Sequence, residues 1–410
     1  MSVDRLAGTT AQRRVMLMLW SLTFGSFLTT SSGATRSPFL LDMARDLETD
    51  LTSVANLMAI MAVTWGIMSL VAGTVSDRIG RKPILIGSIV MVGVAMAGIG
   101  LAPSYPVAVI WGLAGGIGGG GFMGTVFATV SDHVEPSRRG QSLGWVMTGQ
   151  SLSLVLGVPL STLIGAQFGW RGAHVTFALA TVLVGILMLL LVPQRGRFQA
   201  SAREAAAAAP LKTIMTPRIL SLLISGTTER VCFAAMSVYL ATFLISTYGV
   251  PLEWLAGVLM LVAFGNLAGN MLGGQLADRV WSKEGMYGLS LVLTAVVVLP
   301  LLLWTPRLEV SIGLGFACSF VNAVGRPSFM AALSSVPESV RGTVLGLNVT
   351  FNSVGWISAA TIGGWLVAGS GFGSLGVFCA AVALLGTVVL GAGVLLAGRT
   401  VTVQPELVTR

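Results

Sequence analysis

Apolar stretches of about twenty residues or more recur along the whole chain of 410 residues. A helix of roughly 20 residues crosses the ~30 Å hydrocarbon core of a bilayer, because each residue adds about 1.5 Å. With 54% hydrophobic and only 10% charged residues, the chain is too apolar for a water-soluble globule. We therefore expect an all-α integral membrane protein. The twelve predicted spans are 15–40, 53–76, 83–102, 106–130, 141–166, 172–192, 219–246, 252–277, 285–304, 308–334, 342–368 and 371–397.

The basic residues are distributed unevenly between the two sides that these spans define. With the N-terminus inside, eighteen of the 24 Lys and Arg residues fall in inner loops and tails, three in outer loops and three within spans. An excess of basic residues in short loops marks the cytoplasmic side of a membrane. The pattern predicts a plasma membrane protein, in a bacterium an inner membrane protein, with both termini cytoplasmic. It also accounts for the net charge of +8 without nucleic acid as a partner.

Two landmarks recur at nearly the same offset. Gly73-x-x-x-Asp77-Arg78 follows the second span, and Gly274-x-x-x-Asp278-Arg279 follows the eighth, 201 residues later. Arg139-Gly140 and Arg341-Gly342, which precede the fifth and eleventh spans, are 202 residues apart. The chain is therefore expected to contain two pseudo-symmetric six-helix bundles, an architecture of secondary transporters. The predicted parts are a tail at 1–14, a bundle at 15–192, a linker at 193–218, a bundle at 219–397 and a tail at 398–410.

The loop GTVSDRIGRK, Gly73 to Lys82, resembles in full the G-x-x-x-D-R-x-G-R-K loop of the major facilitator superfamily. The resemblance extends over essentially the whole chain, because the twelve spans, the central linker and a degenerate second copy of the loop are all present. It implies a transporter that works by alternating access and needs no cofactor. It does not indicate the substrate, since members with very different cargo share this loop.

The same loop predicts a cytoplasmic gate. Glycines allow a tight turn and close helix approach, and a carboxylate at Asp77 can be received by the N-terminus of span eleven, around Gly342-Thr343, when the inner ends of the bundles meet. The family resemblance implies the same role, and the alternative is a solvated charge cluster that only sets topology. The gating candidates are Gly73, Asp77, Arg78, Gly80, Arg81, Lys82, Gly274, Asp278 and Arg279.

Ionisable residues inside spans are costly and are candidates for function. They are Arg36 in span one, Glu229 and Arg230 in span seven and Arg326 in span ten. In the resembled family these spans line the central cavity. Three arginines against one glutamate favour an anionic or acceptor-rich substrate. For Arg36 the alternative is a side chain that reaches the membrane interface or pairs with Asp42.

Glu229 is the only acid near the middle of the membrane, about 15 Å beyond the start of its span. Because neighbours on a helix point about 100° apart, we expect Glu229 not to pair with Arg230. Arg326 is instead expected to neutralise Glu229 until a proton replaces it, and a permanent structural ion pair is the alternative. Secondary cavity candidates, for which hydrogen bonds between helices are the commoner explanation, are Gln150, Asn266, Asn270, Asn348 and Asn352.

The remaining motifs bear on mechanism. The glycines of 115–124 predict a close-packing surface, because they lie in an apolar span and lack the Lys-Ser/Thr ending of a phosphate loop. Gly112 stands where many proton-coupled relatives have an arginine, which argues against an ordinary proton antiport. The segment 157–165 partly resembles the glycine-proline signature of exporters.

Together these features predict proton-coupled export of a small organic solute, with an anion favoured, by a monomer in the lipid bilayer. Proton-coupled uptake of an organic anion or a vitamin-like nutrient is the second hypothesis. A non-transporting receptor or scaffold with the same fold is the third. An enzyme is not expected, since the chain has no metal-ligand spacing, no nucleophile-base pair and no nucleotide loop.

Overall fold

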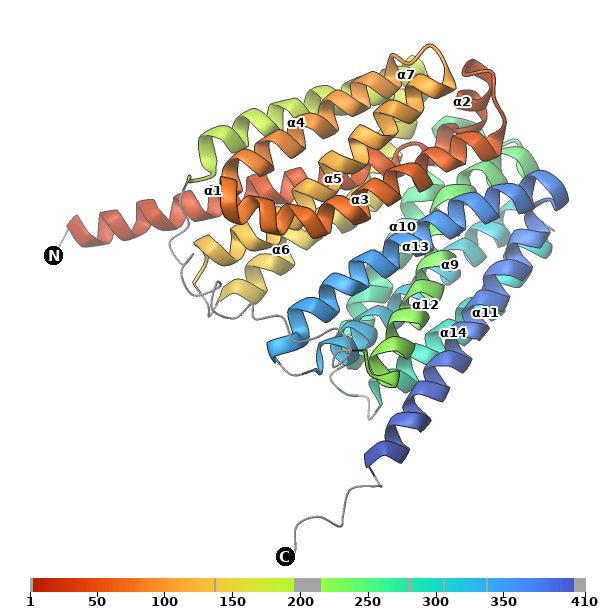
Figure 1. Ribbon diagram of the computed structural model, residues 1–410. Coiled ribbons are helices and arrows are strands. Elements are labelled where there is room, and N and C mark those ends of the chain that lie inside the picture. The colour runs from red at the N-terminus through yellow and green to blue at the C-terminus, as the bar shows by residue number, and fades with distance from the viewer. Residues whose placement is uncertain are drawn as a thin grey trace, which may run out of the picture. The chain divides into compact units, whose positions relative to one another are not determined.

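The computed structural model describes residues 3–135, 138–194, 215–277, 279, 282–304, 307–336 and 338–401. All regular elements in these ranges are helices (Figure 1). The predicted all-α membrane fold is thereby confirmed. Most of the predicted linker, the stretch 195–214, lies outside these ranges, as does Asp278.

The first half of the chain contains the first six predicted spans. Its helices are α1 (Val3–Ala34), η1 (Ser37–Phe39), α2 (Leu40–Asp46), α3 (Leu51–Ile79), α4 (Arg81–Gly100), α5 (Tyr105–His133), α6 (Arg139–Leu152), η3 (Ser153–Gly157) and α7 (Val158–Leu191). Helix α1 begins at Val3, so the predicted tail 1–14 is largely helical and continuous with the first span. Within α7 the chain breaks at Gly169, where φ is +69°, and this break separates the fifth and sixth spans.

The second half contains the other six. They are α9 (Pro217–Tyr248), α10 (Leu252–Ala277), α11 (Lys283–Leu303), α12 (Leu308–Ser334), α13 (Glu338–Ser370) and α14 (Phe372–Val401). By length and composition, 10 stretches of the described chain can cross a membrane, and one of them, Gln141–Leu191, has 51 residues and holds spans five and six. Helix α13, with 33 residues, coincides with predicted span eleven. A helix therefore lies at each of the twelve predicted positions.

Large apolar side chains cover the outer surfaces of these helices. Leu190 on α7 is 74% exposed and Leu395 on α14 is 72% exposed. In water such a surface would cause aggregation, whereas in a bilayer it contacts lipid chains. The exposed apolar surface is the one expected of a multi-pass membrane protein.

The chain divides into two compact units. One consists of Met1–Ala205 with Leu244–Met260, and the other of Ala206–Phe243 with Leu261–Arg410. The predicted bundle 15–192 lies wholly in the first unit, and most of 219–397 lies in the second. The end of α9 and the start of α10 group with the first unit, so the bounds of the two bundles stay a prediction.

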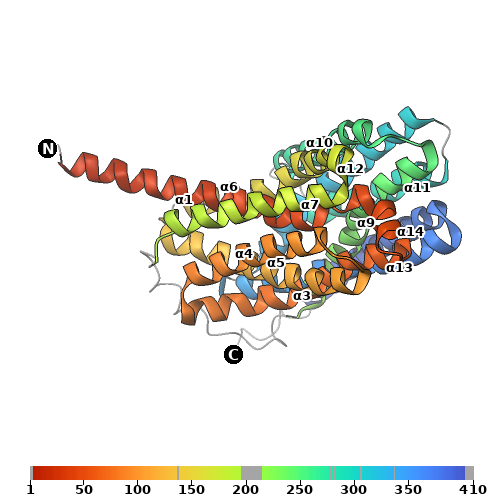
Figure 2. The same cartoon turned by 90° about the horizontal axis from the view of Figure 1, so that it is seen from above.

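The internal duplication is visible in how helices pack within each unit. Helix α4 packs against α5 and α7, and its counterpart α11 packs against α12 and α14 (Figure 2). The first and fifth spans share a hydrogen bond in which Thr23 Oγ1 donates to the Trp145 carbonyl at 3.4 Å. The seventh and eleventh spans share its counterpart, from Thr227 Oγ1 to the Phe351 carbonyl at 3.3 Å. Two related bundles are therefore present, as the repeated sequence landmarks predict.

The glycines of α5 form a packing surface, as their sequence context predicts. A Cβ atom added at Gly120 would lie 2.3 Å from the carbonyl oxygen of Trp65 on α3, so only glycine permits this approach. In the second unit the corresponding helix pair is α10 and α12. There the glycine lies on α10, the counterpart of α3, and not on α12, the counterpart of α5. A Cβ atom added at Gly269 of α10 would lie 2.3 Å from the Phe320 carbonyl oxygen of α12.

Candidate functional site

The turn between α3 and α4 is a single residue. Helix α3 ends at Ile79 and α4 begins at Arg81, with Gly80 between them at φ +110°, a conformation that favours glycine. Because the turn is this short, Arg81 lies directly beside the last turn of α3. The expected tight turn is confirmed at Gly80.

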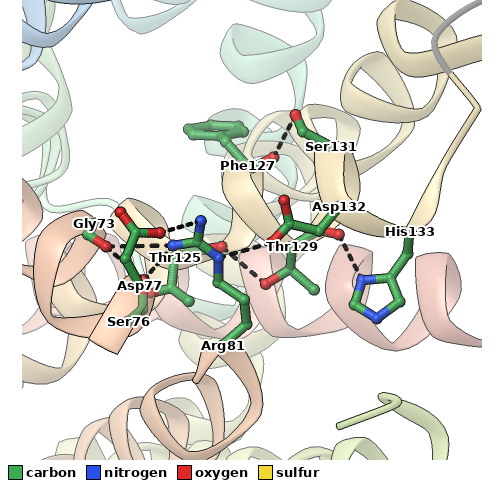
Figure 3. Close-up of polar contacts among 10 residues, drawn as sticks. All are labelled: Gly73, Ser76, Asp77, Arg81, Thr125, Phe127, Thr129, Ser131, Asp132 and His133. Atoms are coloured by element: carbon green, nitrogen blue, oxygen red, sulfur yellow. Dashed lines mark hydrogen bonds and ion pairs between the residues drawn. The ribbon is translucent and has the colours of Figure 1, made fainter. Parts of the chain in front are cut away.

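Arg81 joins three helices through its guanidinium group, as Figure 3 shows. Its Nη2 lies 2.5 Å from Asp77 Oδ1 on α3, and its Nε donates to Asp132 Oδ2 on α5 at 2.9 Å. Its Nη1 donates to Ser76 Oγ at 2.6 Å and to the Gly73 carbonyl at 3.3 Å. Asp132 is only 2% exposed, so this is a buried ion pair that holds the adjoining ends of α3, α4 and α5 together.

Asp132 is absent from the predicted site. It is the only acidic residue of α5 and lies in the same region as the loop, which is the one sequence signal that could have indicated it. The Asp77 side chain, by contrast, is 50% exposed, although it also contacts Arg81. Of the two carboxylates on Arg81, only Asp77 therefore has surface available for another partner.

The other gating candidates have different surroundings. A Cβ atom at Gly73 or at Gly274 would meet nothing within 4 Å, so the expected close helix approach is not found at either glycine. Arg78 and Arg279 are exposed, and Lys82 is half-buried. Asp278 and the side chains of 338–343 lie outside the described part of the chain. The contact of Asp77 with span eleven stays a prediction.

In the second unit, Glu229 and Arg230 form an ion pair. Both side chains are buried in α9, and Arg230 Nη2 donates to Glu229 Oε2 at 3.0 Å. The expectation that these neighbours do not pair is wrong. Although their Cβ atoms point about 100° apart, the long arginine side chain has enough rotatable bonds to bring its head group back to the carboxylate.

Arg326 on α12 does not replace Arg230 as the partner of Glu229. It interacts electrostatically with both residues, but it makes no hydrogen bond or ion pair with any residue that the structure describes. Its guanidinium carbon lies 5.9 Å from the ring centre of Phe233, and that of Arg230 lies 4.7 Å from the same ring. Two guanidinium groups therefore lie near the same Phe233 ring. The ring quadrupole stabilises this arrangement, and repulsion between the two positive charges opposes it.

Phe233 is half-buried and also contacts Trp356 on α13, with ring centres 6.0 Å apart and planes at 88°. Neither aromatic residue is among the predicted site residues. Apolar helices contain many aromatic side chains for packing, so nothing in the sequence distinguishes Phe233 from the others. Only the positions of the two guanidinium groups single it out.

Several buried polar atoms of α9 and α12 are unpartnered among the described residues. They include Glu229 Oε1, Arg230 Nε and both side-chain amide atoms of Asn322 on α12. Buried polar groups are normally hydrogen-bonded, and the two arginines exceed the single glutamate by one positive charge. We refer to Glu229, Arg230, Phe233, Asn322 and Arg326 as the α9–α12 charge cluster. Its composition suits an anion with hydrogen-bonding capacity.

The secondary candidates mostly bond within the protein. Asn270 Nδ2 donates to Asn266 Oδ1 at 3.0 Å, which confirms that the two share one face of α10. Gln150 Nε2 lies 3.5 Å from the sulfur of Met123, and Asn348 Nδ2 lies 4.0 Å from that of Met330. These contacts join neighbouring helices and favour a packing role. Asn352 is half-buried.

Arg36 lies between α1 and η1 and is 1% exposed. The alternative in which it reaches the interface or pairs with Asp42 is wrong, because Asp42 lies 4.0 Å from Arg45 instead. Arg36 belongs to the first unit, whereas the α9–α12 charge cluster belongs to the second. Among the described residues, no group of three or more His, Cys, Asp or Glu side chains is arranged to hold a metal ion.

Two related helical bundles, a buried charge cluster and a one-residue turn flanked by charged side chains are features of membrane transporters of the repeated-bundle class. A family model described as Major Facilitator Superfamily matches residues 22–284 and 254–408. The chain belongs to this family.

Individual relatives are distant but cover most of the chain. An uncharacterized MFS-type transporter, YwfA of Bacillus subtilis (strain 168), is 25% identical over 91% of this chain and 91% of its own length. The 3-(3-hydroxy-phenyl)propionate transporter of Escherichia coli (strain K12) is 27% identical over 82% of this chain and 83% of its own. Among solved structures, an inward-facing, unoccupied bacterial homologue of the human lysosomal transporter Spinster superposes with a TM-score of 0.74. It is 16% identical and covers 93% of this chain and 95% of its own, a likeness of fold alone.

Proposed function

We propose that the chain transports a small organic anion together with a proton. The observation that carries this proposal is the α9–α12 charge cluster, in which two arginines outnumber one glutamate and Arg326 makes no hydrogen bond to a described residue. A carboxylate of the solute supplies the acceptors that this guanidinium lacks, and a planar guanidinium binds a carboxylate with two parallel hydrogen bonds.

The aromatic pair beside the arginines suits a solute that also carries an apolar ring. Phe233 and Trp356 meet edge to face at 6.0 Å, and both are half-buried. A ring placed against them buries apolar surface while its carboxylate reaches Arg326. The Escherichia coli relative is named for a phenyl-substituted propionate, which is an acid of this kind. An aromatic carboxylate is therefore the proposed substrate class.

The Glu229–Arg230 ion pair determines the proposed direction of coupling. When Glu229 takes up a proton, Arg230 loses its counter-charge and the cluster gains one positive charge, so it attracts an anion more strongly. Proton and anion then bind together rather than in competition. In a membrane with an inward proton gradient, this mechanism drives uptake, the second of the two transport hypotheses from sequence.

Export, the first hypothesis from sequence, is retained as the second candidate function. One observation favours it: the exporter-like segment 157–165 follows a π-helical turn, Ser153–Gly157, and includes Pro159 at the start of α7. A local break of this kind in a membrane helix often marks a functional site. Export of an anion in exchange for a proton requires the two ligands to exclude each other, which the ion pair does not favour.

For the gate, we propose that Arg81 fixes Asp77 at the end of α3 while leaving half of its surface available to the N-terminus of α13. The contact would form only in the state that is closed to the cytoplasm. We further propose a monomer in the bacterial inner membrane with both termini cytoplasmic, on the distribution of basic residues between the loops.

Flux into proteoliposomes tests the transport proposal. The solutes are 3-phenylpropionate and, as a neutral match, 3-phenylpropanamide, with an inward acid gradient imposed. Accumulation of the acid in the direction of proton flow, without accumulation of the amide, is the expected result. Accumulation against the direction of proton flow would assign the protein to export, and no saturable flux of either solute would favour a receptor or scaffold.

A further inference from the structure

Arg36 is a buried cation that has no counter-ion among the residues that the structure describes. It has the largest side chain among those that are fully buried in the described chain, with 1% of its surface exposed. Its Nε and Nη1 have no hydrogen-bond partner. A buried charge is strongly destabilising unless it is paired and hydrogen-bonded, and an arginine in a membrane protein cannot lose its proton to escape that cost.

The nearby acids are already engaged. Asp42 lies 4.0 Å from Arg45, and Asp46 accepts a hydrogen bond from Trp170 Nε1 at 2.8 Å. Asp46 also lies 4.0 Å from Arg171. No acidic side chain of the described chain acts electrostatically on Arg36, so these residues supply no negative charge there.

The groups around Arg36 are polar and unpartnered as well. His174 on α7 is buried and interacts electrostatically with Arg36, and its Nδ1 bonds to the Trp170 carbonyl at 2.8 Å, which leaves Nε2 without a partner. Thr35 Oγ1, on the neighbouring residue, is buried and unpartnered too. A hydroxyl can donate to an anion, and a neutral imidazole can accept from a guanidinium or a water molecule. Among the described residues, these groups therefore form a buried polar region of the first unit with an uncompensated positive charge.

We propose that Arg36 holds a small inorganic anion of the chloride class inside the first unit. One monovalent anion neutralises the single charge and accepts hydrogen bonds from the guanidinium and from the Thr35 hydroxyl. A single small ion fits this position better than an organic solute, because the side chain is only 1% exposed and a monatomic anion displaces the fewest neighbouring atoms. The site lies in a different unit from the α9–α12 charge cluster and does not depend on the proposed substrate.

Halide-dependent stability of the purified full chain tests this site. The protein is prepared in a gluconate buffer, and sodium chloride or bromide replaces gluconate at constant ionic strength. Because a ligand that binds only the folded state stabilises it, saturating halide should raise the unfolding temperature by about 2 °C or more. The response should disappear in Arg36→Gln and persist in Arg45→Gln, a matched arginine whose side chain is 80% exposed. Absence of a halide response in the native chain, or an equal response in Arg36→Gln, would overturn the proposal.

Two further measurements apply if Arg36→Gln does not fold. In Arg36→Lys the charge remains but the fixed fork of donors is lost, so the halide midpoint should rise at least about threefold. In crystals of the native chain grown with bromide, an anomalous peak should lie within hydrogen-bond distance of Arg36. Competition with 3-phenylpropionate separates the two sources of an anionic group. If that acid removes the halide response, the site belongs to the transported solute and a resident inorganic anion is refuted.

Discussion

The guanidinium of Arg230 lies 3.0 Å from the carboxylate of Glu229, the preceding residue in the same helix. This pair is buried, yet Glu229 Oε1 and Arg230 Nε remain unpartnered. The two charges thus neutralise each other while keeping polar atoms for a third participant, which makes the pair a suitable point for proton coupling.

Glu229→Gln should abolish accumulation driven by a pH gradient while leaving exchange of solute across the membrane measurable. The amide resembles the protonated acid permanently, and exchange does not require the empty carrier to lose its proton. Proteoliposome flux with and without a gradient measures both activities. Glu253→Gln, at an exposed acid near the start of α10, is the matched control and should behave as the native protein. Loss of exchange together with accumulation would indicate a structural ion pair.

Arg326→Gln should weaken binding of 3-phenylpropionate by roughly 10-fold to 100-fold and leave binding of 3-phenylpropanamide nearly unchanged. A hydrogen bond to a charged group contributes about 1.5–3 kcal/mol, and only the acid forms it. Equilibrium binding of the two solutes gives the comparison. Arg307→Gln, at an exposed arginine immediately before α12, controls for a general effect of lost positive charge. Equal losses for acid and amide would show that Arg326 supports the fold rather than the solute.

Asp132→Asn should destabilise the first unit by about 1–3 kcal/mol or more, because it leaves the buried side of the Arg81 guanidinium without its charged acceptor. Thermal unfolding in detergent measures the loss. Asp77→Asn is the comparison, since it removes the exposed partner of the same arginine and should cost less. A larger loss for Asp77→Asn would mean that Asp132 is not the residue that anchors Arg81.

Asp77→Asn should also increase opening on the cytoplasmic side while the protein stays folded. In the proposed gate, an uncharged amide would lose most of the attraction that the ionised Asp77 has for the positive end of a helix. Cysteines introduced near the inner ends of α6 and α13 should react faster with an aqueous thiol reagent in this variant. Unchanged labelling with normal transport would remove Asp77 from the gate.

Asp50 caps the N-terminus of α3, and its side chain accepts a hydrogen bond from the Ser53 amide at 2.8 Å. Hydrogen bonds from the Ser53 backbone and hydroxyl hold the pKa of Asp50 below its usual value of 3.8. Because the folded-state pKa is lowered, the stabilisation is complete above the usual value and is lost as the pH falls through the lower folded value. Hydrogen exchange at the Ser53 amide should accelerate in Asp50→Ala near neutral pH, and the difference should vanish in strong acid. A difference that persists unchanged in acid would contradict the role of the ionised cap.

The helices and the α3–α4 loop could be predicted because their signals are local. An apolar run reports its own length, and GTVSDRIGRK contains both the turn glycine, Gly80, and the arginine, Arg81, that the turn positions. Asp132 could not be linked to Arg81, because the two are 51 residues apart and no spacing rule connects a single acid on α5 with a loop between other helices.

The charge cluster shows a second limit. Its charged residues could be predicted from sequence, because a charge inside a membrane is costly and therefore marks a functional candidate. Which of them pair could not be predicted, because pairing depends on the positions of the flexible side-chain ends and not on the directions of the Cβ atoms. Helical geometry alone therefore predicts the wrong partner for Glu229. Phe233 gives no sequence signal at all, since its importance comes from two guanidinium groups that approach it from α9 and α12.

The glycine that permits close packing is at Gly120 of α5 in one unit but at Gly269 of α10 in the other, on opposite members of the corresponding helix pair. The same close approach of two helices is therefore made possible by a glycine on a different partner in each half of the chain. A chimera that exchanges α5 for α12 would place two bulky surfaces against each other, whereas one that exchanges α3 and α5 together for α10 and α12 would keep one smooth surface in each contact. In this transporter, the unit that can be exchanged between the two halves without a steric clash is therefore the helix pair and not the single helix.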